Sequence, residues 1–63
     1  MNPSTWIFLR GAGRRMTHAV SDAAISNLQL EINNALEEGN TWQEIADAAL
    51  LPVGTVRRYG ATK

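Results

Sequence analysis

The chain of 63 residues contains no cysteine and only one histidine, His18. Without cysteine it has neither a disulfide framework nor a thiolate for catalysis or metal binding. A lone histidine cannot build a zinc site, which usually takes about four Cys or His ligands. A core of this size rarely supplies more than about 3–5 kcal/mol of stability without such help or a partner subunit. We therefore expect no metal and no other cofactor, and a chain that forms a homodimer.

Long apolar runs and catalytic motifs are missing as well. The longest apolar run covers residues 6–9, far below the roughly 18 residues that span a bilayer and the 7–15 of a secretory signal. The sequence has no Ser–His–Asp grouping at a recognisable spacing and no glycine-rich phosphate loop. We predict a soluble, cytoplasmic protein that makes no membrane contact and is not an enzyme.

The formal net charge is zero, but the acidic and basic residues occupy different parts of the chain. All six acids lie between Asp22 and Asp47, and the six bases lie outside this stretch: Arg10, Arg14, Arg15, Arg57, Arg58 and Lys63. If the acids face solvent, the basic ends can gather on one face and meet phosphates. The alternative is an ordinary solvated surface whose ends happen to be positive.

Residues 1–20 show no sustained helical period and contain Pro3, Gly11 and Gly13. This composition predicts an N-terminal arm, partly disordered or extended, with a short extended piece at residues 5–10. Its aromatic residues Trp6 and Phe8 either pack on the body or meet a partner. Met16 offers an alternative translation start, in which case the first fifteen residues would be dispensable to the fold.

From residue 21 the pattern becomes helical. Apolar residues recur at i, i+3, i+7 and i+11, which predicts a helix over about residues 21–38 with one apolar stripe; they are Ile25, Leu28, Ile32 and Leu36. Ser21 is suited to the N-cap, and Gly39 can take the left-handed conformation that ends a helix. Leu30 falls opposite the stripe, where the arm or a second subunit would cover it.

A second helix is predicted over residues 42–49. Thr41 is followed three residues later by Glu44, the spacing of a capping box in which each side chain bonds the other residue's backbone amide. Ile45, Ala49 and the face of Trp42 would point inward.

A third helix is predicted over residues 52–59, because Pro52 suits a first helical turn and Gly60 ends the segment. If Val56 and Tyr59 face the core, the 100° helical increment turns a small basic face outward. That outward face comprises Gly54, Arg57 and Arg58, with Val53 and Thr55 on its flanks.

These two segments resemble the helix-turn-helix signature of phage and plasmid repressors, and residues 51–56 are similar to the start of the recognition helix in region 4 of bacterial sigma factors. Ala46 matches the small residue of the family's first helix and Val56 the buried residue of its recognition helix. The resemblance covers about twenty residues. One position departs from the pattern: the turn residue, commonly glycine in the family, is Leu50. A leucine there is strained if its φ is positive.

The resemblance implies an all-α fold, a small trihelical helix-turn-helix domain over residues 21–63 behind an N-terminal arm. It also implies a DNA-binding transcriptional regulator that places helix 52–59 in the major groove of double-stranded DNA as a dimer. The implied DNA-contacting residues, on the third helix, at the start of the second and in the arm, are Arg57, Arg58, Val53, Gly54, Thr55, Thr41, Gln43, Arg14 and Arg15.

A second hypothesis belongs to a different class. The same helical body can serve as a protein-interaction module, an inhibitor or adaptor of a regulator. Its contact surface would then be Trp6, Phe8 and Leu30 beside the acidic middle. Near-neutral net charge favours this hypothesis, whereas the position of Arg57 and Arg58 favours DNA binding.

Overall fold

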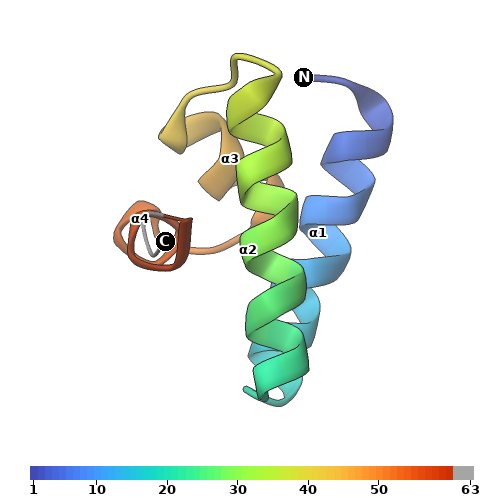
Figure 1. Ribbon diagram of the computed structural model, residues 1–63, viewed down its shortest axis with the longest axis vertical. Helices are drawn as coiled ribbons and strands as arrows, with labels where there is room; N and C mark the ends of the chain where they lie inside the picture. Colours follow the sequence, from blue (N-terminus) through green and yellow to red (C-terminus); the bar gives the residue numbers. More distant parts are fainter. Residues whose placement is uncertain (61–63) are drawn as a thin grey trace.

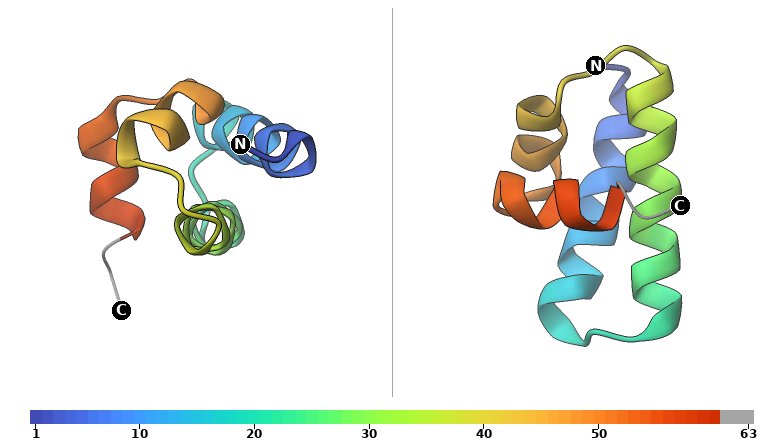
Figure 2. Two further views of the ribbon diagram at one scale, coloured as in Figure 1. Left: turned by 90° about the horizontal axis from the view of Figure 1, so that it is seen from above. Right: turned by 60° about the vertical axis from the view of Figure 1, so that its left-hand side comes forward.

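The structure is a computed structural model and describes residues 1–60. All regular secondary structure in this part is helical, in the order α1 (Pro3–His18), α2 (Asp22–Glu37), α3 (Trp42–Ala49) and α4 (Val53–Gly60). α1 and α2 form an antiparallel pair, and α3 and α4 pack on one side of it (Figures 1 and 2). The predicted all-α class is confirmed, with four helices in place of three. Residues 61–63 of the predicted domain, including Lys63, lie outside the described residues.

The predicted N-terminal arm is wrong, because residues 3–18 form the helix α1. Asn2 caps its start by accepting a 2.9 Å hydrogen bond from the Ser4 amide, and Pro3 occupies the first turn, where a missing N–H is harmless. The two glycines that obscured the helical pattern are tolerated because tertiary packing outweighs their helix propensity. Gly13 is buried against α3.

The first fifteen residues are part of the fold, because they contribute side chains to its core. Leu9 is fully buried, and Ala12 and Met16 continue the same buried face of α1. This face joins the buried side of α2 in one core, to which α3 and α4 also contribute. α1 therefore supplies a wall of the core that the trihelical prediction lacked.

The helix predicted over residues 21–38 is confirmed as α2, with Ser21 and Glu38 as its caps. The Ser21 hydroxyl accepts a 3.2 Å hydrogen bond from the Ala24 amide. Leu28 and Ile32 of the predicted stripe are fully buried. Gly39 has a φ of +93°, the left-handed region that glycine tolerates best and that ends the helix.

Glu38 has a tertiary role that its position in the sequence conceals. An acid at a helix C-terminus opposes the helix dipole. In the antiparallel pair, however, the end of α2 lies beside the start of α1, and the Glu38 carboxylate accepts a hydrogen bond from the buried Thr5 hydroxyl. The first turns of α1 carry the positive end of that helix's dipole. The contact therefore offsets the unfavourable interaction of Glu38 with the dipole of α2.

Candidate nucleic-acid interface

α3 begins at the predicted capping box. The Thr41 amide donates to the Glu44 carboxylate at 2.8 Å, and the Glu44 amide donates to the Thr41 hydroxyl at 3.2 Å. The hydrogen bond from the Thr41 backbone, followed by that from its side chain, lowers the pKa of Glu44. α3 runs Trp42–Ala49 as predicted, with Ile45 fully buried and Trp42 half-buried.

The turn after α3 has the backbone conformation expected of a glycine. Leu50 has φ 59° and ψ 41°, and its amide bonds the Ala46 carbonyl. The Leu51 amide also bonds that carbonyl, at 3.1 Å. The departure noted in the sequence is therefore a real conflict, since a residue with a Cβ loses about 1–2 kcal/mol in this region. The Leu50 side chain is 62% exposed and recovers little by packing.

α4 begins at Val53 and ends at Gly60, one residue later at each end than predicted. The Pro52 carbonyl accepts its first hydrogen bonds, from the Thr55 and Val56 amides at 3.0 and 3.2 Å. Val56 is fully buried, as predicted. A Cβ at Gly60 would lie 2.6 Å from Ile32 Cγ2, so the end of α4 sits directly on α2.

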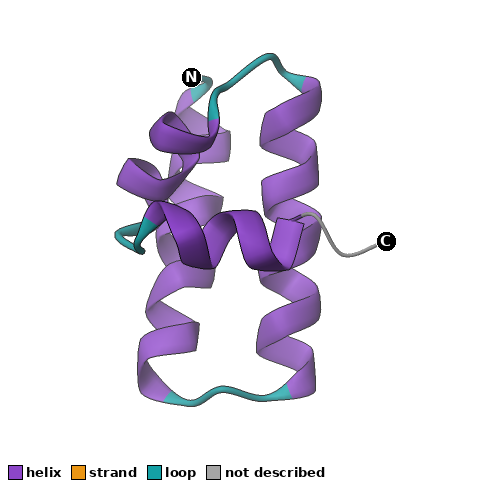
Figure 3. Ribbon diagram, turned by 90° about the vertical axis from the view of Figure 1, so that its left-hand side faces the viewer, coloured by secondary structure: helices purple, strands orange, loops and turns teal. Residues whose placement is uncertain are grey.

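The predicted outward face of α4 is confirmed as a surface. Gly54, Arg57 and Arg58 are exposed, Val53 is 38% exposed and Thr55 is half-buried on the flank. Neither arginine forms a hydrogen bond or ion pair with another residue of 1–60. Figure 3 shows α4 lying across the α1–α2 pair on the face turned to the viewer. The fold thus presents two unpaired guanidinium groups on the solvent-exposed face of α4.

The start of α3 is a weaker anion site than the sequence implies. Thr41 and Gln43 are exposed, but the Gln43 amide group donates to Asp47 at 3.0 Å. The Glu44 carboxylate already occupies the capping position, and its negative charge repels a phosphate. Only the amides of Trp42 and Gln43 are left to meet a phosphate there.

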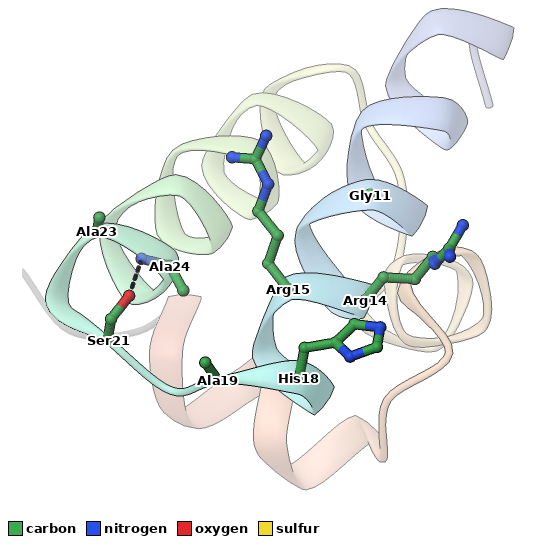
Figure 4. Close-up of a pocket in the computed structure, with 8 residues that line it drawn as sticks. All are labelled: Gly11, Arg14, Arg15, His18, Ala19, Ser21, Ala23 and Ala24. Carbon is green, nitrogen blue, oxygen red and sulfur yellow. Dashed lines mark hydrogen bonds between the residues drawn. The ribbon is translucent and has the colours of Figure 1, made fainter.

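Arg14 and Arg15 belong to α1 and are not brought onto the face of α4. Both are exposed, and within residues 1–60 α1 and α4 do not pack against each other. Figure 4 shows Arg14 and His18 pointing to one side while Arg15 extends toward α2. All three line an open pocket of about 550 Å³ at the turn between α1 and α2.

Arg10 has a structural role that sequence reasoning missed. Its Nε donates a 2.9 Å hydrogen bond to the Ala48 carbonyl near the C-terminal end of α3, and its guanidinium lies 4.3 Å from the centre of the Trp6 ring. A cation at a helix C-terminus is favourable, as is a guanidinium over an indole. The spacing of Trp6 and Arg10 at i, i+4 would have signalled this contact if the segment had been recognised as a helix.

The residues of the predicted protein-contact surface do not form one patch. Trp6 is 43% exposed on the side of α1 nearest α3, where Arg10 covers it. Phe8 is 56% exposed and lines a groove between α1 and α2. Leu30 is 65% exposed on α2 and is not covered by α1, contrary to the expected burial by the arm.

No family model, curated protein or solved structure matches this chain. Among residues 1–60, no helix combines the length and apolarity needed to cross a membrane. The same residues contain no group of three or more His, Cys, Asp or Glu side chains placed to hold a metal ion. The described surface carries two pairs of adjacent exposed arginines, Arg57 and Arg58 on α4 and Arg14 and Arg15 on α1.

Proposed function

We propose that the chain is a small DNA-binding regulator that inserts α4 into the major groove. The observation that carries this proposal is the pair Arg57 and Arg58, exposed and unpaired within residues 1–60 on a helix that is anchored by buried Val56. The succession of α3, a left-handed turn and α4 supports the proposal, because two short helices joined by a tight turn are what proteins use to place a second helix in the groove.

The outward face of α4 has the chemistry of direct base readout. An arginine that bonds guanine O6 and N7 with both nitrogens gives about 1–3 kcal/mol of discrimination against the wrong base. The methyl groups of Val53 and Thr55 are suited to the thymine methyl group. Nothing lies within 4 Å of the position of a Cβ on Gly54, so the helix backbone can approach the bases closely there.

Contacts to phosphates would orient this helix without reading sequence. The Trp42 and Gln43 amides at the start of α3 supply one such contact. Arg14 is exposed on α1 outside the face of α4, and Arg15 extends toward α2 (Figure 4). A single module buries only about 600–1,000 Å² on DNA, so two linked copies, each on its own site, would bind more tightly than one.

The test begins with selection of a preferred duplex from a random library, followed by Kd measurements on the selected and a scrambled duplex over a range of salt. Arg57→Ala/Arg58→Ala should abolish the preference, because the base contacts are lost. Arg14→Ala removes an exposed positive charge outside α4 and outside the groove that Arg15 lines, and is the control. The control should weaken binding to the selected and the scrambled duplex by the same factor, because it removes at most phosphate contacts.

Two results would refute the proposal. One is selection that enriches no sequence while the wild-type protein is folded by circular dichroism. The other is an Arg57→Ala/Arg58→Ala variant that still prefers the selected duplex, because readout would then lie elsewhere on the protein.

The second candidate function is a protein-interaction module, and the exposure of large apolar side chains favours it. Trp6, Phe8 and Leu30 are each at least 43% exposed. Phe8 and its neighbour Ile7, 56% and 60% exposed, line one groove together, and contiguous exposed apolar side chains commonly mark a contact site. On this hypothesis Arg57→Ala/Arg58→Ala would leave partner binding intact, whereas Phe8→Ala would abolish it.

A further inference from the structure

The α1–α2 pair carries an open groove on the side that α3 and α4 leave uncovered. Its volume is about 430 Å³, and its walls come from α1 and α2 alone, with Ile7, Phe8, Arg15 and Glu31 among them. Figure 2 (left) shows α4 on the other side of the pair. We call this feature the hairpin groove. It is separate from the face of α4 proposed to bind DNA.

Apolar side chains at the hairpin groove are unusually accessible. Ile7 is 60% exposed and Phe8, the one phenylalanine of the chain, is 56% exposed. Burial of each would remove a large apolar surface from water. The groove therefore has the apolar component that a protein–protein contact requires.

Glu31 supplies an unsatisfied acceptor at the same place. One of its carboxylate oxygens, Oε2, is shielded from solvent and accepts no hydrogen bond from residues 1–60. A shielded carboxylate oxygen without a donor is unfavourable, and such groups are normally paired. A donor from a second chain can therefore reach only the other carboxylate oxygen, Oε1, which also accepts no hydrogen bond from residues 1–60.

Arg15 supplies an unused donor in the same groove. Its side chain is exposed, and it forms no hydrogen bond or ion pair with other residues in the range 1–60. Figure 4 shows it extending from α1 toward α2. Each copy of the chain thus carries one unpaired cation and one unpaired carboxylate in a single groove, a self-complementary charge pattern.

Self-complementarity is what a two-fold interface between identical chains demands. In such an interface residue i meets residue j while j meets i. A two-fold axis through the hairpin groove between Arg15 and Glu31 brings both unlike pairs together. An unrelated partner would need no such symmetry in this chain, so the pattern favours a second copy.

The available area is adequate for this contact. α1 and α2 have 16 residues each, which makes each helix about 24 Å long. With helix axes about 8–10 Å apart, the pair presents a face of roughly 500 Å² per copy. Two such faces bury roughly 1,000 Å², the lower limit for a specific interface.

We propose that the hairpin groove binds the hairpin groove of a second copy, with Arg15 of each chain on Glu31 of the other and Ile7 and Phe8 buried around them. Because α4 lies on the opposite side of each α1–α2 pair (Figures 2 and 3), the two α4 helices face away from each other in this dimer. The dimer then joins two separate duplex segments instead of reading two half-sites of one straight duplex. This last consequence rests on the proposed DNA-binding function, whereas the dimer itself does not.

The mass of the full chain in solution tests the dimer. Sedimentation equilibrium should show a concentration-dependent dimer for the wild-type protein. Arg15→Glu and Glu31→Arg should each raise the dimer Kd by about tenfold or more, because each places like charges in contact. The double variant Arg15→Glu/Glu31→Arg should restore the wild-type Kd. Circular dichroism on every variant separates lost association from lost folding.

Three outcomes would overturn the dimer. The wild-type protein could sediment as a monomer at every concentration, including the millimolar range. The single variants could dimerise as well as the wild-type chain while folded. The double variant could recover thermal stability but stay monomeric, which would assign Arg15 and Glu31 to a pair within one chain.

A DNA-joining assay separates this proposal from the proposed function. An immobilised duplex of the selected sequence should retain a second, labelled duplex in the presence of the wild-type protein or the double variant. The charge-reversal single variants should bind one duplex but fail to join two. If Arg57→Ala/Arg58→Ala dimerises but retains no DNA, both proposals stand. If the wild-type dimer retains one duplex but never two, only the joining of two duplexes is contradicted.

Discussion

Two glycines in α1 lie two residues apart and meet different surroundings. A Cβ at Gly13 would lie 2.0 Å from the Ala49 carbonyl oxygen, so α1 and α3 can approach only because that atom is missing. A Cβ at Gly11 would meet nothing within 4 Å. The same residue type is therefore a packing requirement at one position and only a helix-weakening residue at the other.

Alanine substitution should change stability in opposite directions at these two sites. Gly13→Ala forces the backbones of α1 and α3 apart and should cost about 1–3 kcal/mol, even after the gain in helix propensity. Gly11→Ala, the matched control, should gain about 0.5–1 kcal/mol. Urea unfolding followed by circular dichroism measures both. Equal effects of the two substitutions would contradict the close α1–α3 contact.

At the scale of the element, the turn between α3 and α4 determines where the outward face of α4 points. The Leu50 amide and the Leu51 amide both bond the Ala46 carbonyl, and Leu50 holds the left-handed conformation at φ 59°. Its side chain is 62% exposed, so no packing compensates for the strain. A left-handed non-glycine residue on an exposed turn is a local weakness of the fold.

Leu50→Gly should stabilise the protein by about 0.5–1 kcal/mol, because glycine adopts this φ without strain. The gain is smaller than the strain removed, because glycine also makes the unfolded chain more flexible. Leu50→Ala keeps the Cβ and is the control, which should show no such gain. Thermal unfolding compares the three proteins. A glycine variant no more stable than the alanine variant would show that the turn is unstrained.

At the scale of the whole molecule, the core depends on all four helices. The described residues have a radius of gyration of 10.1 Å and extents of 27 × 23 × 17 Å. In so small a body α1 is a wall of the core, with Leu9 fully buried beside α2 and α3. Removal of that wall exposes the buried stripe of α2.

Leu9→Ala should therefore cost about 2–5 kcal/mol, comparable with the whole stability expected of a chain of this length. Leu30→Ala is the matched control, because Leu30 is 65% exposed and a surface substitution changes stability by about 0.5 kcal/mol or less. Circular dichroism at 25 °C should show loss of helix in the first variant only. A Leu9→Ala protein as stable as the wild-type protein would contradict the role of α1 as a wall of the core.

The helices from residue 21 onward could be predicted because their signals are local. Spacing along the chain predicts three of their features. These are the apolar stripe of α2, the Thr41–Glu44 capping box and the exposure of Gly54, Arg57 and Arg58. α1 could not be predicted in this way. Its two glycines lower helix propensity, and the benefit of Gly13 appears only when Ala49 is beside it.

The sequence by itself determined the all-α class, the bounds of α3 and the basic outward face of α4, because capping and periodicity act within a few residues. The tertiary structure alone decided that residues 3–18 form a core helix, that Arg10 caps α3 and that Arg15 shares a groove with Glu31. These features depend on contacts between residues distant in the chain. Such contacts outweigh local propensity in a core this small, and no local pattern records them.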